Sequence, residues 1–464
     1  MLVVFINLKP NIESNHPRHV LPPLDIGYCA SLLEKNGNKA NLIDLNINNY
    51  SINELFSYVK ENKCDVLVIK AAINTTDLTL RLSNKIKDVV KKIFLIGPFA
   101  SLYYKDFIFK GSPIDLVILD EPELTLLELV ENLKKNKSIK HTAGVAYYNK
   151  KVIKTEQRQL INDLDTLPFP KQEFFINKGY PFYYPVNIKK KINVGYILSS
   201  RGCQYNCVFC LPVERDSYGK AFRMRNAKNV VDEMELLRSK GVNVIYFIDD
   251  FFTGNPKQVL NICDEIINRK LNLKWIAQCR IDSLNKDLLV NMKKAGCSTL
   301  CLGIESGSDR ILKILNKCIN KNQITETVKM IKEQGIMIMA NFIIGSPTET
   351  KNEMKDSLNL AKKLCPEMIN ISLFAIYNPK NFDNKYKNFS RFDVTSNFSK
   401  LNDKELKQFQ KYFYRKYCLN PKFISKLVLR QGIFATLNWR KFIFGTLRYL
   451  SGISSKGLIK INES

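Results

Sequence analysis

Short apolar runs alternate with amphipathic stretches along the first 150 or so residues. The apolar runs predict buried β-strands at Val3–Leu8, Lys39–Asp44, Val66–Ala71, Ile93–Ile96 and Leu116–Leu119. Apolar residues at helical spacing predict the helices between them, at Leu24–Asn36, Ile52–Glu61, Leu78–Lys91 and Glu123–Asn136. Strands that alternate with helices predict an α/β fold with a parallel, doubly wound, Rossmann-like sheet, whose ligands bind beyond the carboxyl ends of the strands.

The same alternation returns between Val194 and about Pro379. The predicted strands are Val194–Ser199, Val244–Asp249, Trp275–Cys279, Thr299–Gly303, Met337–Ile344 and Met368–Phe374. The predicted helices include Lys228–Lys240, Pro256–Arg269, Lys286–Lys294, Ile324–Gln334 and Lys351–Leu364. Successive strand–helix units of this kind predict a partial (β/α)6 TIM-type barrel, a fold that carries its chemistry at the carboxyl ends of the strands.

These patterns divide the chain into four parts. We predict a doubly wound domain at 1–148, a Pro- and aromatic-rich linker at 149–192, a barrel at 193–380 and a basic helical region at 381–464. Within the last part, Phe423–Leu450 mixes apolar residues with Lys and Arg. Two interpretations stay open for this segment: it lies on a membrane surface, or it covers the open side of the barrel.

Composition bears on the cellular location of the protein and on its partners. Met1–Asn7 has no basic region or cleavage site before it, so it predicts a strand rather than a signal peptide, and no stretch of about 20 apolar residues predicts a membrane span. Twelve cysteines without an export signal predict reduced thiols and a cytoplasmic protein, peripheral to the inner membrane face if Phe423–Leu450 binds there. The net charge of +27 comes from lysines scattered along helices rather than gathered in one arm, so we do not expect a nucleic-acid partner.

Three cysteines with C-x3-C-x2-C spacing follow the first predicted barrel strand. Cys203, Cys207 and Cys210 can bind three irons of a [4Fe–4S] cluster and leave the fourth iron open to a substrate or cofactor. A ferredoxin would supply a fourth cysteine nearby, but none follows before Cys263, and a zinc site usually pairs two knuckles. The remaining alternative is three unrelated buried thiols.

The loop Arg201–Cys210 resembles the cluster motif of the radical S-adenosylmethionine (SAM) enzymes. The resemblance implies that the three cysteines bind the cluster and that Phe209 lies near the adenine of SAM. In this family the open iron binds the amino and carboxylate groups of SAM. One electron from the cluster then breaks a carbon–sulfur bond and releases a 5′-deoxyadenosyl radical. The resemblance also implies an external electron donor such as flavodoxin or ferredoxin.

Further segments at predicted strand ends resemble the SAM-binding parts of the same family. The resemblance assigns Glu305 and Ser306, in Gly303–Gly307, to the ribose or methionine end of SAM. It assigns Gly345, in a Gly-x-Pro-x-Glu-Thr turn, to close approach near the adenine. It implies that Asp249 or its neighbour Asp250 binds the SAM amino nitrogen. Arg280 is expected to pair with the SAM carboxylate.

Each of these assignments has a structural alternative. Ser306 and Ser308 also suit the start of a helix, and Glu349 after the Gly345 turn also suits a helix cap. Two acids in a loop are usually solvated. The cysteines outside the motif show no second cluster spacing, and Cys279, Cys297 and Cys301 lie in or near apolar strands, which predicts core thiols.

Pro22–Glu34 with Lys39–Leu45, and Ile114–Glu123, resemble the cobalamin-binding domain that precedes many radical SAM cores. Four departures are visible. Leu24 stands where the cobalt-binding histidine would be, Gly97-Pro98 replaces a Gly-Gly, and Asp120–Glu123 replaces Gly-Glu-x-Glu. The usual serine is absent from Lys70–Thr76. The resemblance therefore implies either cobalamin bound without a histidine, or a domain that kept the fold and lost the ligand.

His16 and His19 lie in the loop before the first predicted helix. They either cap the cobalt face, touch substrate, or are ordinary loop residues.

Together these resemblances imply a radical SAM enzyme that acts on an unactivated carbon of a small-molecule or lipid-like substrate. Methyl transfer from methylcobalamin is the leading prediction, and cobalamin-linked cyclisation or rearrangement is the alternative. A transfer-RNA methylthiotransferase would carry three more cluster cysteines in its N-terminal domain, where only Cys29 and Cys64 occur. A non-catalytic scaffold would have no need of the SAM-binding segments.

Overall fold

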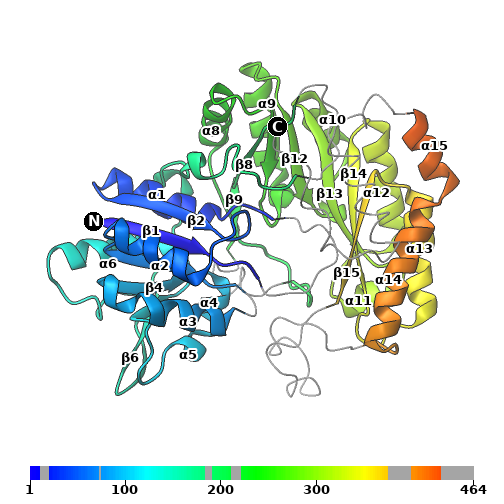
Figure 1. Cartoon of the computed structure of the whole chain (residues 1–464). Coiled ribbons are helices and arrows are strands. Elements are labelled where there is room, and N and C mark those ends of the chain that lie inside the picture. Colours follow the sequence, from blue (N-terminus) through cyan, green and yellow to red (C-terminus); the bar gives the residue numbers. More distant parts are fainter. Residues whose placement is uncertain (11–19, 73–74, 183–190, 211–220, 375–398, 430–464) are drawn as a thin grey trace, which may run out of the picture.

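The chain folds into two α/β units that lie side by side, blue to cyan and green to yellow in Figure 1. The computed structural model describes residues 1–10, 20–72, 75–182, 191–210, 221–374 and 399–429. His16 and His19 lie outside these residues.

The first unit is built on a seven-stranded sheet with the order β2-β1-β3-β4-β5-β6-β7. Its strands are β1 (Leu2–Asn7), β2 (Lys39–Asp44), β3 (Val66–Lys70), β4 (Lys92–Ile96), β5 (Leu116–Ile118), β6 (Val145–Asn149) and β7 (Lys151–Lys154). The first five are parallel, which confirms the predicted doubly wound sheet. The antiparallel strands β6 and β7 were not predicted, and they extend the sheet past residue 148.

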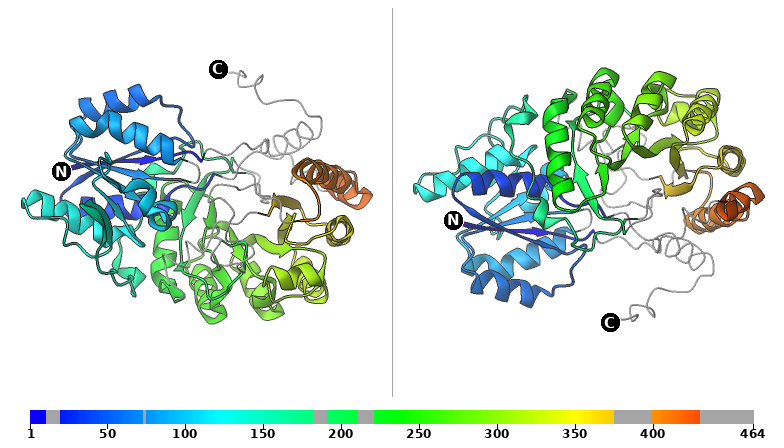
Figure 2. Two further views of the ribbon diagram at one scale, coloured as in Figure 1. Left: turned by 90° about the horizontal axis from the view of Figure 1, so that it is seen from below. Right: turned by 90° about the horizontal axis from the view of Figure 1, so that it is seen from above.

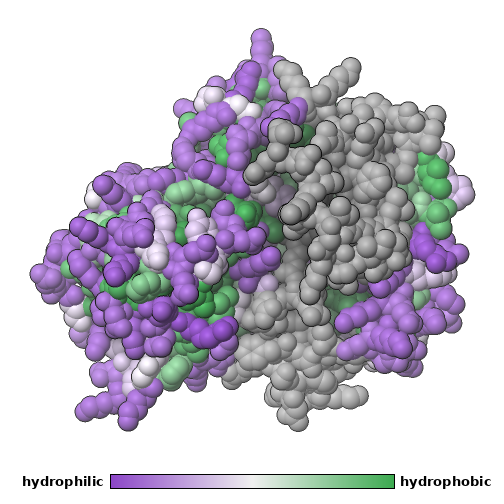
Figure 3. Space-filling view, viewed as in Figure 1, coloured by the Kyte–Doolittle hydropathy of each residue, from purple (hydrophilic) through white to green (hydrophobic). Residues whose placement is uncertain are grey.

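Helices cover both faces of this sheet (Figure 2). One face carries α1 (Leu24–Lys35) and α6 (Pro122–Lys134), and the other carries α2 (Ile52–Glu61), α3 (Thr76–Ile86), α4 (Pro98–Leu102) and α5 (Tyr104–Phe107). Helix α2 shows how the sequence sets such boundaries: Ser51 and Glu54 cap it reciprocally. In Figure 3 the visible face of this unit is mainly hydrophilic, and its apolar side chains gather toward the second unit.

Helix α1 lies between the two units. Ile26 and Ala30 contact the core of the first sheet, whereas Tyr28 and Leu32 belong to the core of the second unit. The linker passes over α1 at Gly27, where an added Cβ would lie 2.8 Å from the ring of Phe175. Glycine at this position therefore has a packing reason that is independent of any ligand.

The second unit is a parallel six-stranded sheet in sequential order, open between its first and last strands. The strands are β8 (Val194–Ile197), β11 (Val244–Phe247), β12 (Lys274–Cys279), β13 (Cys297–Glu305), β14 (Met337–Ile344) and β15 (Met368–Leu373). The helices between them are α8 (Ala227–Ser239), α9 (Pro256–Asn268), α10 (Lys286–Lys294), α11 (Asp309–Ile314), α12 (Lys321–Glu333) and α13 (Lys351–Leu364). This arrangement confirms the predicted partial (β/α)6 barrel.

A small antiparallel ribbon stands at the start of the cluster loop. It pairs β9 (Ser200–Arg201) with β10 (Arg223–Met224), and Arg201 lies opposite Arg223. The sequence pattern did not predict this ribbon, because two-residue strands carry no detectable periodicity.

The C-terminal helix α14 (Asp403–Cys418) covers the open edge of the barrel. The Ile371 N–H on β15 donates to the Tyr414 hydroxyl at 2.9 Å, and Gln410 Nε2 donates to the Ile371 carbonyl at 2.7 Å. These bonds satisfy backbone groups that an uncovered edge strand would expose. The predicted helical C-terminal region is therefore present, and it closes the barrel on this side.

The start of Phe423–Leu450 also packs on the barrel. It lies in α15 (Pro421–Leu429), where Phe423 is buried and Lys426 pairs with Glu367 at 2.6 Å. Residues from 430 onward lie outside the described part of the chain. Among the described helices, none has the length and apolar character to cross a bilayer.

Candidate active site

The three motif cysteines line one cavity of about 400 Å³ at the carboxyl ends of the barrel strands. The cavity also receives side chains from the ends of β12 to β15 and from the segments that follow β11 and α11. The polar and aromatic residues that line it are Tyr205, Phe209, Asp250, Gln278, Arg280, Glu305, Lys317, Asn341, Phe342, Asn370, Ser372 and Phe374.

The three thiols of the cluster loop differ in their exposure to solvent. Cys210 is exposed, Cys203 is half-buried and Cys207 is buried, and burial raises the pKa of the Cys203 thiol. Val208 N donates to the Leu315 carbonyl at 3.2 Å, which ties the loop to the end of α11. Among the described residues, no three His, Cys, Asp or Glu side chains are grouped to hold a single metal ion. A [4Fe–4S] cluster does not need such a group, because each thiolate binds a different iron.

Arg280 supports the cluster loop. Its Nη1 donates to Cys207 Sγ at 3.4 Å, and its guanidinium carbon lies 3.5 Å from the ring centroid of Tyr205. Its Nε and Nη2 both donate to the Asp282 carboxylate at 2.9 Å. Burial acts to lower the pKa of Arg280, but the bonds to Asp282 outweigh it and the pKa is raised. The guanidinium therefore stays charged beside a sulfur that must be a thiolate to bind iron.

These contacts argue against the expected role of Arg280. Asp282 occupies the Nε–Nη2 edge of the guanidinium, and on the other edge Nη1 donates to Cys207 Sγ and Nη2 to the Lys317 carbonyl, so neither edge is open for a bidentate pair with the SAM carboxylate. The structure instead shows Arg280 in the cavity wall, where it donates to Cys207.

A buried ion pair, absent from our predictions, lies beside the cluster loop. Lys317 Nζ is 2.9 Å from Glu305 Oε1, and both side chains are less than 8% exposed. Glu305 adopts a left-handed backbone conformation with φ of 67°. A Cβ on Gly303 would lie 2.3 Å from Glu305 Oε1, so glycine there makes room for the pair. Lys317 follows α11 without any motif around it, so only the tertiary contact identifies it.

Phe209 and Glu305 both line the cavity, as expected for residues that contact SAM. The Phe209 ring lies 5.5 Å from Lys317 Nζ and packs with Ile311 and Phe374. Their individual contacts with the adenine and the methionine end of SAM stay predictions.

Asp249 is placed differently from our expectation. It is fully buried, lies outside the cavity lining and accepts bonds from Ser199 Oγ at 2.7 Å and Ser200 Oγ at 2.6 Å. Burial raises its pKa to about 6. Asp249 thus anchors the strand end that leads into the cluster loop, and its neighbour Asp250, which lines the cavity, is the better placed carboxylate.

Ser306 and Gly345 also have structural roles and lie outside the cavity lining. Ser306 is buried, and its Oγ accepts from Ser308 N at 3.1 Å, while Ser308 is the residue that caps α11 by accepting from Ile311 N. Gly345 has φ of 83°, and an added Cβ would lie 3.0 Å from Leu406 of α14. The close approach at Gly345 is therefore to the C-terminal helix.

Glu349 closes the turn after β14. Its Oε2 accepts from Gly345 N at 2.7 Å and Ser346 N at 3.0 Å, while its buried Oε1 has no hydrogen-bond partner. Burial raises the pKa of Glu349 to about 8. This carboxyl therefore folds most favourably in its protonated form.

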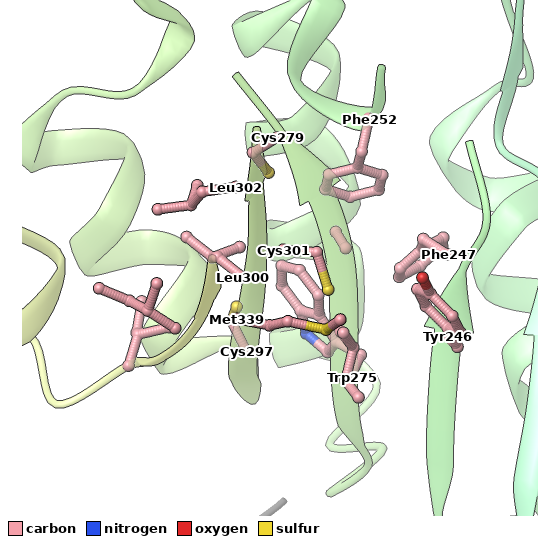
Figure 4. Close-up of a cluster of buried hydrophobic side chains, with 14 of the residues drawn as sticks. Tyr246, Phe247, Phe252, Trp275, Cys279, Cys297, Leu300, Cys301, Leu302 and Met339 are labelled. Carbon is pink, nitrogen blue, oxygen red and sulfur yellow. The ribbon is translucent and has the colours of Figure 1, made fainter. Parts of the chain in front are cut away.

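Cys279, Cys297 and Cys301 lie among apolar side chains such as Trp275 and Leu300 (Figure 4). Burial raises the pKa of Cys279 to about 12. These cysteines are core thiols, as predicted, although Cys279 and Cys301 also reach the floor of the cavity.

A second cavity of about 420 Å³ lies between the two units, at the carboxyl edge of the first sheet. Its lining includes Leu24 and the ion pair of Asp25 with Lys70, whose oxygen and nitrogen are 2.7 Å apart. Lys70 passes close to Gly97, where an added Cβ would lie 3.2 Å from its Cγ. Asp250 lines this cavity and the first one, so the two cavities adjoin.

Comparison with known proteins agrees with this geometry. Residues 197–361, which hold the cluster loop and most of the barrel, match the radical SAM superfamily. The barrel of this chain is therefore similar to a radical SAM domain over these residues. The chain is an enzyme, and its domain is of the type that uses SAM and an iron–sulfur cluster.

Relatives and solved structures extend the likeness to between 80% and 95% of the chain. An uncharacterized methyltransferase of Pyrococcus horikoshii is 28% identical over 87% of this chain and 89% of its own length. An anaerobic magnesium-protoporphyrin IX monomethyl ester cyclase of Rubrivivax gelatinosus is 26% identical over 95% of this chain and 77% of its own length. TsrM, a radical SAM methyltransferase from Kitasatospora setae, superposes with a TM-score of 0.65 at 17% identity, covering 80% of this chain and 73% of that one. The cobalamin-dependent radical enzyme OxsB superposes with a TM-score of 0.65 at 19% identity, covering 92% of this chain and 56% of its own. Both structures share the fold.

The motif cysteines are open to a direct test. Anaerobic reconstitution should give about four irons and four sulfides per chain, because three thiolates suffice to hold the cluster. Replacing Cys203, Cys207 and Cys210 with alanine should abolish the charge-transfer absorbance and SAM cleavage. The matched control replaces the three cysteines Cys263, Cys297 and Cys418, which lie outside the cavity lining. A motif variant that still forms 5′-deoxyadenosine under dithionite would disprove the assignment.

Glu349 predicts a pH dependence of stability. Its pKa is about 8 in the folded protein against an ordinary value of 4.5. The stability that the protonated carboxyl contributes is complete below the unfolded pKa and is lost as pH rises through the folded one. Glu349→Gln should therefore flatten the fall in the free energy of unfolding between about pH 5 and pH 8. Urea unfolding at several pH values measures this slope.

Glu353→Gln is the control, because its pairing with Arg310 lowers the pKa of Glu353 to about 2, far below that window. Equal slopes for the wild type and Glu349→Gln would contradict the assignment.

Proposed function

We propose that this chain is a cobalamin-dependent radical SAM enzyme that transfers a methyl group to an unactivated carbon of a small molecule. The observation that carries the proposal is the junction of the two cavities at Asp250. A substrate held at this junction would contact both the cavity that holds the cluster cysteines and the cavity at the edge of the first sheet. Methyl transfer initiated by a radical needs such proximity, because the two reacting partners must meet without diffusion.

The lining of the second cavity supports cobalamin as the second cofactor. The cavity lies at the carboxyl edge of a doubly wound sheet, where ligands of this fold bind. Leu24, at the position of the usual cobalt-binding histidine, lines the cavity together with Asp25 and Lys70, so we expect a corrin to be held without a histidine from that position. When bound, cobalamin supplies the chemistry of a methyl carrier. TsrM and OxsB, which share the fold, were solved with cobalamin.

The residues of the chain would bind, orient and shield the reactants. Arg280 would support Cys207 through its hydrogen bond to the sulfur, and the pair of Glu305 with Lys317 would present one fixed charge of each sign to the zwitterionic end of SAM. Asn341 and Asn370, joined at 3.2 Å on the cavity wall, offer amide groups to a polar substrate. Of the three motif cysteines, Cys210 is the exposed one, so an external electron donor such as flavodoxin or ferredoxin would approach the cluster from the side of Cys210.

Radical cyclisation is the alternative. The cyclase of Rubrivivax gelatinosus aligns with 95% of this chain, so its reaction class shares the same domain plan.

The products of SAM distinguish the two reactions. A methyl group transferred from SAM leaves S-adenosylhomocysteine, whereas hydrogen abstraction alone yields 5′-deoxyadenosine and methionine. We expect the reconstituted protein with hydroxocobalamin, SAM and a chemical reductant to form S-adenosylhomocysteine in a cobalamin-dependent manner. The control omits cobalamin and keeps the cluster. Formation of 5′-deoxyadenosine with no S-adenosylhomocysteine at any cobalamin concentration would favour cyclisation or rearrangement.

Peripheral membrane contact through Phe423–Leu450 is a separate proposal, supported by the basic and apolar composition of the segment. It would favour a lipid-like substrate. Each Lys or Arg near an anionic surface should add about 1 kcal/mol at low salt. Co-sedimentation with anionic liposomes should therefore fall as salt rises, and it should fall further in a chain ending at Asn420. Equal sedimentation of the two chains would exclude this anchor. Loss of the cluster on truncation would instead favour the barrel-closing role.

A further inference from the structure

Four charged side chains from both units meet in a buried cluster, which we call the arginine–glutamate clamp. Glu121 and Glu123 stand at the start of α6, Arg201 lies on β9 and Arg223 lies on β10. Arg201 Nη1 donates to Glu121 Oε1 at 3.1 Å, and its Nη2 donates to Glu123 Oε1 at 2.6 Å. Arg223 Nη2 lies 2.9 Å from Glu121 Oε1. None of the four side chains is more than 7% exposed.

The charges of the clamp balance one another. Burial acts to raise the pKa of Glu121, but its bond from Arg223 and the charge of Arg201 outweigh this effect and lower it. Burial raises the pKa of Glu123 despite the same arginine, and Glu123 Oε2 has no hydrogen-bond partner. Removing one member would leave an uncompensated buried charge, which is strongly destabilising. A cluster of this kind fixes the relative position of the segments that carry it.

The clamp also includes the linker. Ile161 N donates to Glu121 Oε2 at 2.8 Å, and Arg223 Nη1 donates to the Ile161 carbonyl at 2.6 Å. Three segments that are distant in sequence, namely the start of α6, the linker and the β9–β10 ribbon, therefore meet at one carboxylate.

Arg201 connects the clamp to both cavities. It lines the cavity between the units. It also stands two residues before Cys203, and Gly202 between them has φ of 86°, which makes the turn into the cluster loop. A shift of Arg201 would thus move the backbone that carries the first cluster thiol.

We propose that the clamp is a positioning device, through which the N-terminal domain sets the place of the Cys203 thiol, with Arg201 as the positioning residue. The inference rests on the proposed function only for the cluster that Cys203 would bind. It assigns a role to the Glu121–Glu123 segment that needs no cobalamin contact.

The first experiment uses the metal-free full chain. Arg201→Lys keeps the charge but loses the planar fork that reaches two carboxylates, and Glu121→Gln removes the shared negative charge and replaces one of the two acceptor oxygens with a donor NH2 group. In both variants the iodoacetamide alkylation rate of Cys203, followed by peptide mass spectrometry, should rise about threefold or more as the loop opens locally. Cys418 on α14 is the internal control and should keep its rate.

The second experiment uses the reconstituted protein. Arg201→Lys should retain about four irons, because the three thiols remain. The change that SAM causes in the electron paramagnetic resonance spectrum of the reduced cluster should shrink. SAM cleavage should slow about tenfold or more, because a displacement of ~1 Å between reacting groups is costly. Two variants serve as matched controls. Glu128→Gln changes a half-exposed carboxylate of α6 that pairs with Arg158. Arg269→Lys changes an arginine that pairs with Asp232 and Glu265 at the surface. Both controls should behave like the wild type.

Unchanged alkylation rates and spectra in Arg201→Lys would overturn the inference, even if its thermal midpoint falls, because a merely structural clamp would alter stability alone. If Glu121→Gln fails to fold, Arg201→Lys decides the question. Failure of the proposed function would look different: the wild type would form no S-adenosylhomocysteine, while the alkylation test, which uses no cluster, would keep its outcome.

Discussion

The Glu121 carboxylate, at the start of α6, is the contact on which the arrangement of the molecule depends. It receives Arg201, Arg223 and the backbone of Ile161, all in a buried setting. Charges in such a setting are screened weakly, so their geometry is held closely. The doubly wound sheet and the barrel could each fold around its own apolar core. This contact and the packing of α1 help to hold the carboxyl edges of the two sheets together, so that two cavities meet at Asp250.

Within the barrel, charges beside the reactive loop are paired before any ligand arrives. Arg280 is held by Asp282 and faces Cys207, and Lys317 is held by Glu305. Fixed charges in a partly enclosed cavity need little reorganisation when a charged ligand binds, which is the condition for effective electrostatic stabilisation. The same pairing limits what each group can do. An arginine whose fork is filled cannot also chelate a carboxylate, and a lysine paired with Glu305 acts as part of a dipole.

The predicted site residues fall into two sets, those that line the cavity and those that lie outside its lining. Cys203, Cys207, Cys210, Phe209, Arg280 and Glu305 line the cavity. The second set lies outside the cavity lining. Asp249 accepts hydrogen bonds from Ser199 and Ser200, Ser306 accepts one from Ser308, and Gly345 lies against Leu406. A turn residue that a motif identifies can either face the ligand or support the turn. Asp250 faces the cavity, whereas Asp249, one residue earlier, faces the serines of the strand end. Sequence spacing does not carry that distinction.

The sequence by itself determined the two α/β units, the order of their main strands and the cluster loop, because strand and helix periodicities and cysteine spacing are local properties. The resemblance to cobalamin-binding domains also predicts that Leu24 stands at the position of the cobalt-binding histidine. The tertiary structure alone decided the ribbon β9–β10, the covering of β15 by α14, and the buried pairs of Lys317 with Glu305 and Arg201 with Glu121. Those partners are separated by 12 to 80 residues, and no periodic signal joins them. Burial is what selects them, since a charge removed from water must find its counter-charge wherever the fold brings one near.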